Sequence, residues 1–170
     1  MILVTGRLWV GSGRRLIGAV IKELAMKAEH EAILTLYTAG EVISPLRELI
    51  EVLLKKGVPT VVIVNRWSSQ PEILRRTLLS MKRAYPDLLR IFSFESGEGD
   101  LHAKAFVVDR SKAVVGSSNI TLSGMHYNYE IAVLVEGREA EEVARLLYAL
   151  IRSPLCREIL GPRDVSAKSQ

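Results

Sequence analysis

The chain has 170 residues, enough for one buried core, and its 48% hydrophobic and 25% charged residues are typical of a folded domain, not a disordered chain. Its net charge of +4 favours a polyanionic partner only weakly, because a solvated basic surface gives the same number. The lone Cys156 excludes an intrachain disulfide, and no apolar run reaches the roughly 18 residues of a membrane span.

The first half of the chain alternates between apolar runs typical of buried strands and amphipathic segments typical of helices. Strands are expected at 2–5, 31–37 and 59–64. Helices are expected over about 14–29 and over 41–56. A third helix is expected after the polar segment 65–70 and should run to about 85. Gly57 and Pro86 are the residues that should end the second and third helices.

The second half contains closely spaced strands before one last helix. Strands are expected at 88–94, 101–108, 113–118 and about 127–135, and an amphipathic helix at 138–151. Strands alternating with helices indicate an α/β fold, and the hairpin-like spacing indicates a mixed β-sheet flanked by helices on both faces. We expect a single domain over 1–160 and a flexible tail at 161–170.

Residues 101–119 concentrate side chains that can perform chemistry. An imidazole, an ammonium, a carboxylate, a hydroxyl and a carboxamide follow one another: His102, Lys104, Asp109, Ser117 and Asn119. Alternate residues of a strand share a face. His102 and Lys104 should therefore point together, while Ala103 and Ala105 point into the fold.

The turn between the two strands decides whether the other groups join this pair. A two-residue turn within 109–112 would place Ser117 opposite Lys104 and Asn119 opposite His102, about 5 Å apart across the strands. This register is an assumption, because a slip of one residue would move the side chains to the other face.

Two carboxylates have different expected places. Asp109 lies seven residues after His102, so it should face the other way and support the strand end structurally or electrostatically, without touching substrate. Glu130, on the next expected strand, is the candidate to orient the imidazole of His102 and stabilise its charged form.

These groups suit the chemistry of a phosphodiester, whose negative charge repels nucleophiles. Lys104 would supply positive charge, while Ser117 and Asn119 would donate hydrogen bonds to the non-bridging oxygens. The imidazole of His102 could attack phosphorus, because an ordinary imidazole is largely unprotonated at neutral pH.

The pattern His-x-Lys-x4-Asp-x6-Gly-Ser-x-Asn, filled by residues 102–119, resembles the signature of the phospholipase D superfamily. Asn128-Tyr129-Glu130 resembles the downstream acidic element of that family, and the likeness extends over about 14–152. It implies a phospholipase D-like α-β-α sandwich. It also implies catalytic roles for His102, Lys104, Asn119, Glu130 and Asp109, with phosphate bound by Lys104, Ser117 and Asn119.

Members of this family use two copies of the motif at one active site. One histidine becomes a phosphohistidine, and the other protonates the leaving oxygen and later activates water. Here the motif occurs once, because neither His30 nor His126 begins a second copy. The resemblance therefore implies a homodimer in which the two His102 residues meet near a two-fold axis. It implies no metal and no cofactor.

The expected function is a metal-independent phosphodiesterase of nucleic acid, an endonuclease of the cytoplasm that does not act at a membrane. One alternative is a phospholipase or phosphatidyl transferase acting on lipid phosphodiesters. Another is a nucleic-acid-binding module of a larger restriction, repair or defence system. His126 is expected at the surface, with contact to substrate as the alternative. The pattern does not distinguish DNA from RNA.

Overall fold

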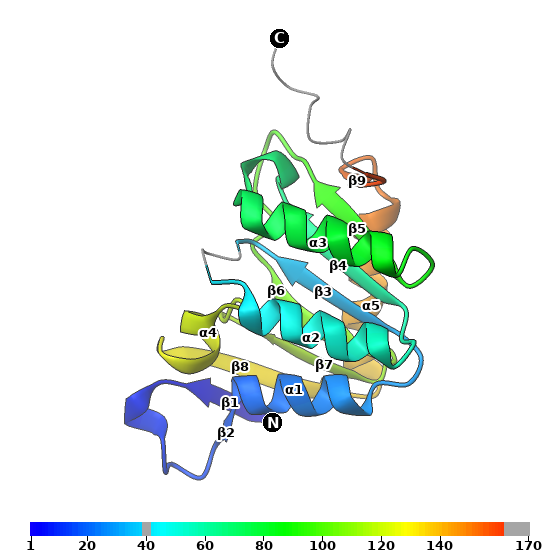
Figure 1. The fold of residues 1–170 in the computed structure, drawn as a ribbon. Helices are drawn as coiled ribbons and strands as arrows, with labels where there is room; N and C mark the ends of the chain where they lie inside the picture. Colours follow the sequence, from blue (N-terminus) through cyan, green and yellow to red (C-terminus); the bar gives the residue numbers. More distant parts are fainter. Residues whose placement is uncertain (39–41, 162–170) are drawn as a thin grey trace.

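A computed structural model describes residues 1–38 and 42–161, and these residues form one mixed sheet of nine strands (Figure 1). The order across the sheet is β2-β1-β8-β7-β6-β3-β4-β5-β9. The strands are β1 (Ile2–Thr5), β2 (Arg15–Leu16), β3 (Ala32–Leu36), β4 (Thr60–Asn65), β5 (Leu89–Phe94), β6 (Lys104–Val108), β7 (Lys112–Gly116), β8 (Glu130–Glu136) and β9 (Cys156–Glu158). Strands β3, β4 and β5 run parallel, whereas β6, β7 and β8 pair antiparallel. The expected mixed sheet is confirmed.

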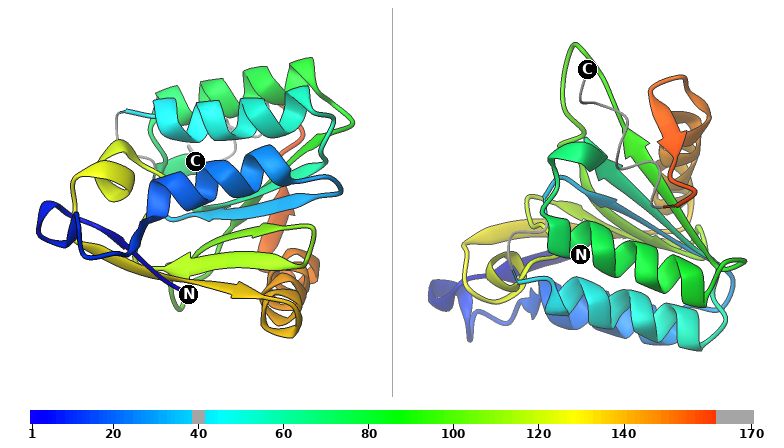
Figure 2. Two further views of the ribbon diagram at one scale, coloured as in Figure 1. Left: turned by 90° about the horizontal axis from the view of Figure 1, so that it is seen from below. Right: turned by 45° about the horizontal axis from the view of Figure 1, so that its top comes forward.

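Helices cover both faces of the sheet, as the sequence predicts (Figure 2). One face carries α1 (Ile17–Lys27), α2 (Ser44–Lys55) and α3 (Glu72–Ala84), and the other carries α5 (Arg138–Arg152). Neighbouring residues of a strand divide between the two cores: Phe106 packs with the three-helix side and Val107 with the α5 side. The short elements are η1 (Arg7–Trp9), η2 (Trp67–Ser69) and α4 (Leu122–His126).

The C-terminal end of α2 lies where Gly57 predicts it. Gly57 has a φ of 77° and follows α2; its N–H bonds to Leu54 O at 3.0 Å, and the N–H of Val58 bonds to Leu53 O at 3.0 Å. These two bonds form a Schellman cap, for which glycine is favoured. Two expected helix starts are too early: α2 begins at Ser44 and not at 41, and α1 begins at Ile17, after β2. Residue 41 itself and the tail at 162–170 lie outside the described residues.

The predicted hairpin register is wrong by one residue. Lys104 pairs with Gly116 and Val108 with Lys112, so the turn contains three residues instead of two. Asp109 and Arg110 occupy it with φ values of 52° and 53°. Because the register shifts by one, Ser117 does not lie opposite Lys104, and β7 ends before Asn119.

Other departures from the sequence-based expectations are smaller. The strand that should begin at 101 begins at Lys104, and Ala103 is exposed instead of pointing into the fold, whereas Ala105 is buried. The short elements β2, β9 and α4 were not predicted. Three or fewer residues of strand carry too little periodicity to be recognised in a sequence.

One edge of the sheet brings together the segments that carry the motif. The parallel strands β3, β4 and β5 end there, β6 and β8 begin there, and β7 ends there. In Figure 1 this is the side where α4 and the loop after β1 lie. The carboxyl ends of parallel strands are the usual place for a ligand in an open α/β sheet.

Candidate active site

His102 and Lys104 are in direct contact at this edge. Nζ of Lys104 lies 2.8 Å from Nδ1 of His102 and donates a second bond, of 2.7 Å, to the His102 carbonyl. His102 itself is exposed, whereas Lys104 is only 8% exposed. The prediction that these two side chains point together is confirmed by the geometry.

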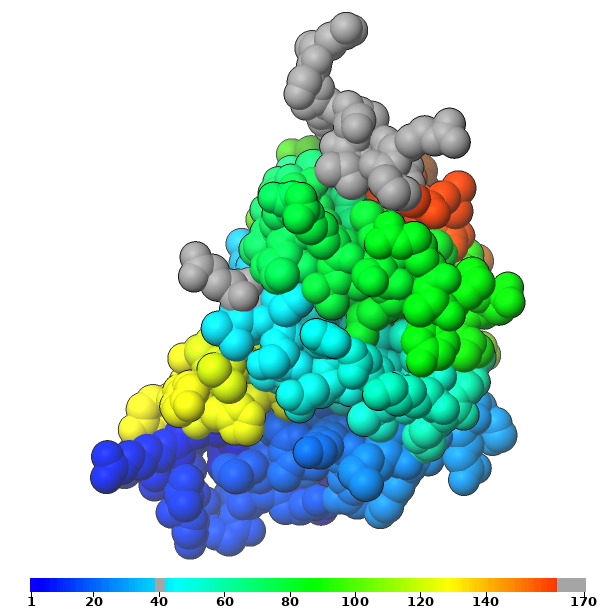
Figure 3. Space-filling view, in the orientation of Figure 1, coloured from blue at the N-terminus to red at the C-terminus, as the bar shows by residue number. Residues whose placement is uncertain are grey.

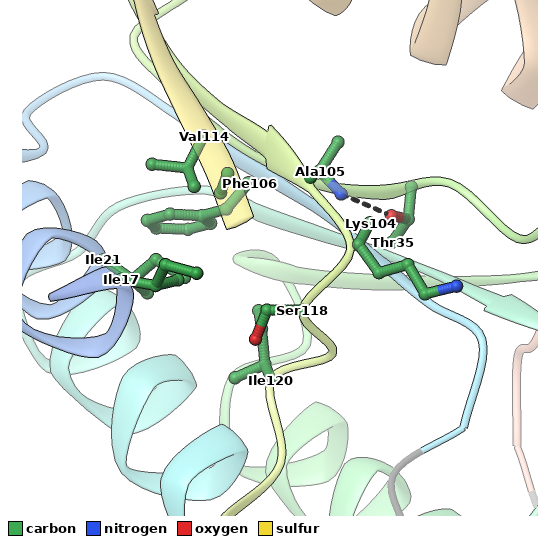
Figure 4. A pocket seen from close by; sticks show the side chains of 11 residues that line it. Ile17, Ile21, Thr35, Lys104, Ala105, Phe106, Val114, Ser118 and Ile120 are labelled. Carbon is green, nitrogen blue, oxygen red and sulfur yellow. Dashed lines mark hydrogen bonds between the residues drawn. The ribbon is translucent and has the colours of Figure 1, made fainter. Parts of the chain in front are cut away.

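Lys104 is held by its apolar stem. The stem lines a small pocket together with Ile17, Phe106 and Val114, and Figure 4 shows its ammonium pointing away from these residues. Burial lowers the pKa of Lys104, and the negative charge of Glu130 opposes that shift. The long aliphatic chain therefore packs in the core while the charge reaches the site.

The Lys104 bond decides which ring nitrogen of His102 carries a proton. An ammonium has donors only, so Nδ1 is the acceptor and a neutral ring bears its hydrogen on Nε2. Such a ring offers Nε2–H as a hydrogen-bond donor, and only its doubly protonated imidazolium form can give a proton to a leaving oxygen. A ring that attacks phosphorus through Nε2 needs that nitrogen free, with Nδ1 donating to another group.

Tyr37 is a site residue that the sequence analysis missed. It follows β3, and its ring meets the His102 ring edge-on with centroids 4.4 Å apart. Nζ of Lys104 lies 5.0 Å from the centroid of the same ring, within cation–π range. One tyrosine thus contacts both members of the pair. A single tyrosine after a buried strand gives no sequence signal of this role.

A second missed feature is the anchoring of the chain just before His102. Oδ1 of Asn65 accepts a 2.9 Å bond from the N–H of Leu101. Arg66 pairs with Asp100 at 2.6 Å and donates to the carbonyl of Ser96 at 3.0 Å. Asn65 ends β4, so the neighbouring parallel strand fixes the loop 95–101 that carries His102 to the edge.

Thr35 of β3 binds the backbone at the point where this loop meets β6. Its hydroxyl donates to the carbonyl of Ala103 at 2.6 Å and accepts from the N–H of Ala105 at 2.9 Å. A side chain thus replaces main-chain pairing between β3 and β6 beyond Leu34 and Phe106, the last paired residues. The strands separate there, and His102 becomes exposed.

Ser117 and Glu130 are joined to each other. The hydroxyl of Ser117 donates to Oε2 of Glu130, and Nδ2 of Asn128 donates to Oε1 at 3.2 Å. Glu130 is also close enough to Lys104 to influence its pKa. These contacts involve the Glu130 carboxylate, and its role in orienting His102 stays a prediction.

Asn119 lies in a groove beside this carboxylate. The groove has a volume of about 450 Å³ and is lined by Asn119, Asn128 and Glu130, among other residues. Oδ1 of Asn119 is buried without a hydrogen-bond partner in the described part of the chain. A buried polar atom without a partner suits a group that binds a ligand.

The glycine of the motif has a packing role. A Cβ at Gly116 would lie 2.5 Å from Cβ of Ala132 and 2.5 Å from the carbonyl oxygen of Ile131. Only glycine lets β7 approach β8 this closely. That approach brings Ser117 within reach of Glu130.

Asp109 lies at the other end of β6 from this group. Its carboxylate accepts bonds from the backbone N–H groups of Glu29, His30 and Glu31 at 2.7–3.2 Å. Burial by itself would raise the pKa of Asp109, but these donors outweigh it and the pKa is lowered. Asp109 thus ties the β6–β7 turn to the start of β3, and the structure does not bring it to His102.

The other two histidines lie elsewhere. His30 is exposed at the same end as Asp109, and His126 lines a groove between α1 and α2. Among the described residues, no group of three or more histidine, cysteine, aspartate or glutamate side chains could hold a metal ion. Across the same residues, no helix has the length and apolar composition that crossing a bilayer requires.

The fold and the motif together define a class. Residues 21–150 match the model of a family described as "Cardiolipin synthase, PLD-like domain". This match covers well over half of the sequence, and the chain belongs to this phospholipase D-like family. The resemblance drawn from residues 102–119 is therefore confirmed.

One curated relative is the DISARM protein DrmC of Bacillus paralicheniformis. It is 27% identical over 144 residues, which are 84% of this chain and 59% of that protein. The chain thus spans about three fifths of the length of this relative.

Three solved structures share the fold. The phospholipase D family member Nuc from Salmonella typhimurium has a TM-score of 0.69 at 15% identity, covering 94% of this chain and 97% of Nuc. Phosphatidylserine synthase of Haemophilus influenzae has a TM-score of 0.72 at 17% identity, covering 94% and 40%. NucT from Helicobacter pylori has a TM-score of 0.59 at 14% identity, covering 77% and 84%. At these identities the likeness concerns the fold alone.

Proposed function

We propose that the chain is a metal-independent phosphodiesterase that cleaves nucleic acid as an endonuclease, through a phosphohistidine. The observation that carries this proposal is the contact between an exposed His102 and a largely buried Lys104 at the carboxyl edge of the sheet. Membership of the phospholipase D-like family supports the phosphodiester as the bond that is cleaved. The net charge of +4 favours nucleic acid over a neutral substrate.

In the first step, Nε2 of His102 attacks phosphorus while the bond from phosphorus to the leaving oxygen breaks. Lys104 and the amide of Asn119 stabilise the negative charge on the non-bridging oxygens. The attacking ring must donate from Nδ1, and Glu130 is the proposed acceptor. The leaving oxygen takes a proton from a second imidazole.

This second imidazole is the partner subunit's His102, since the motif occurs once in the chain. To give up a proton this ring must be an imidazolium with a hydrogen on both nitrogens, and it becomes a neutral imidazole when Nε2 protonates the leaving oxygen. In the second step the same ring accepts a proton from water. The water oxygen attacks the phosphohistidine, the P–N bond breaks, and His102 is restored. We therefore propose a homodimer whose two sites form one centre.

The test is cleavage of plasmid and oligonucleotide DNA and RNA in excess EDTA. We expect cleavage to persist in EDTA and to be lost in His102→Ala. His30→Ala, which removes an exposed histidine outside the site, is the matched control and should cleave normally. Cleavage abolished by chelation, or retained by His102→Ala, would contradict the mechanism.

Activity on a lipid phosphodiester is the alternative that two of the comparisons support. The family model bears the description of a cardiolipin synthase, and one structural neighbour is a phosphatidylserine synthase. The same site could act on a lipid phosphodiester. Turnover of vesicles of phosphatidylglycerol, without cleavage of any nucleic acid, would establish it in place of the nuclease.

A binding module without turnover is the third possibility. The match covers only 59% of DrmC, so in that relative the matched region is one part of a longer protein, as a binding module would be. Tight binding of DNA or RNA, with no cleavage and no phosphohistidine, would support it.

A further inference from the structure

We propose that Arg7, Trp9 and Tyr129 form a stacking platform for an unpaired strand of nucleic acid. The three residues, called here the arm platform, come from η1 and from the residue before β8. This inference rests on the proposed function and deepens it, because it specifies the form of the substrate.

The two rings of the arm platform are held in place, with Tyr129 exposed and Trp9 half-buried. Trp9 and Tyr129 meet edge-on with centroids 5.5 Å apart. The backbone of Gly6 supports the tyrosine: a Cβ there would lie 2.6 Å from Cδ1 of Tyr129, and its φ is 130°. Tyr129 nevertheless remains 60% exposed. An exposed ring that is already fixed can stack on a base with little further loss of entropy.

The platform adjoins the candidate active site. Tyr129 directly precedes Glu130, and Glu130 pairs with Thr5, the last residue of β1. The segment after β1, which includes Trp9, projects beyond the sheet edge beside α4 (Figures 1 and 3). A strand whose phosphodiester reaches His102 can therefore continue over these rings.

The chemistry of the platform favours nucleic acid over a protein partner. Arg7 is exposed, and no ion pair of its side chain occurs in residues 1–38 or 42–161. A guanidinium in the same short helix as Trp9 offers a phosphate contact beside rings on which bases can stack. In a duplex the base faces are covered by their neighbours, so this combination fits an unpaired strand.

The experiment measures binding of two fluorescent oligomers of equal length, oligothymidine and its abasic counterpart. All proteins carry His102→Ala so that no strand is cut. Trp9→Ala and Tyr129→Ala should each weaken oligothymidine binding by about tenfold or more and leave abasic binding unchanged. Tyr129→Phe should bind normally. Arg7→Ala should weaken both oligomers and reduce the salt slope by about one.

Two further measurements separate the alternatives. Met26→Ala, at a 60% exposed residue of α1, is the control and should bind both oligomers normally. With His102 intact, the platform variants should hydrolyse bis-p-nitrophenyl phosphate at the wild-type rate, because this small phosphodiester does not reach the rings. Fluorescence of Trp9 should be quenched by oligothymidine, with Trp67 buried in the core as a constant background.

Several outcomes would overturn the platform. Unchanged oligothymidine affinity, or equal losses with the abasic oligomer, would exclude base stacking. A fall to monomer mass in Trp9→Ala or Tyr129→Ala would make the surface a contact between two copies of the chain. Failure of the wild type to hydrolyse any phosphodiester would refute the proposed function instead, and the binding comparison would still decide the platform.

Discussion

Lys104 belongs both to the core and to the candidate active site, because its aliphatic stem is packed and its ammonium contacts His102. Lys104→Met retains an apolar stem and removes the charge. If the proposed function holds, kcat should fall by about 10²- to 10³-fold, as when one group stabilising the transition state is removed. Thermal unfolding should change little. Lys27→Met, at an exposed residue of α1, is the control. A kcat near that of the wild type would remove Lys104 from the mechanism.

Asp109, in contrast, should matter for stability and not for the chemical step. Asp109→Asn weakens three charge-assisted bonds to backbone N–H groups, which should lower the free energy of unfolding by about 1–3 kcal/mol at pH 7. The activity per folded molecule should stay within about twofold of the wild type. A large loss of kcat with unchanged stability would contradict this assignment.

The pH dependence of that loss follows from the lowered pKa of Asp109. A carboxyl whose pKa is lower in the folded state stabilises the fold above its unfolded pKa. The contribution disappears as pH falls through the folded pKa. The difference in stability between wild type and Asp109→Asn should therefore be full at neutral pH and shrink in strong acid, as denaturant titrations at several pH values would show.

At the scale of elements, the close approach of β7 and β8 at Gly116 positions Ser117 and Glu130. Gly116→Ala would place a Cβ against the backbone of β8, and overpacking of this kind costs about 1–3 kcal/mol. We expect that loss of stability together with loss of activity. Gly97→Ala, where an added Cβ meets nothing within 4 Å, is the matched control and should be neutral. Equal unfolding midpoints for both variants would contradict the packing argument.

The bridge from Thr35 between β3 and β6 gives a second test at this scale. Thr35→Val keeps the shape of the buried side chain and leaves the groups of Ala103 and Ala105 without their partner. We expect a loss of about 1–3 kcal/mol in stability. The His102 loop should also exchange its amide hydrogens faster. Thr35→Ser, which keeps the hydroxyl, should restore both properties, and failure of that rescue would refute the bridge.

The elements show why some predictions succeeded and one failed. The end of α2 depends on Gly57 and its immediate neighbours, so the sequence predicts it. The β6–β7 register depends on a turn held by contacts with Glu29, His30 and Glu31, about 80 residues away. Turn composition alone predicted a two-residue turn, whereas these distant contacts stabilise a turn of three residues.

At the scale of the whole molecule, the single copy of the motif makes a homodimer the central prediction. If two His102 residues form one centre, a dimer with one His102→Ala subunit should be inactive. After subunit exchange in an equal mixture, random pairing leaves about one quarter of the dimers with two wild-type chains, instead of one half without exchange. Activity should therefore fall to about half on mixing. Unchanged activity after proven exchange would contradict a shared centre.

The sequence by itself determined the fold class, the end of α2 at Gly57, and the pairing of His102 with Lys104, because each follows from patterns among residues close together in the chain. Tertiary structure decided the rest. Only folding could bring Thr35 and Tyr37 of the β3 segment and Asn65 of β4 to the segment that carries His102. Asp109 lies at the other end of β6, as its spacing from His102 predicts, but only the fold showed that it binds the backbone N–H groups of Glu29, His30 and Glu31.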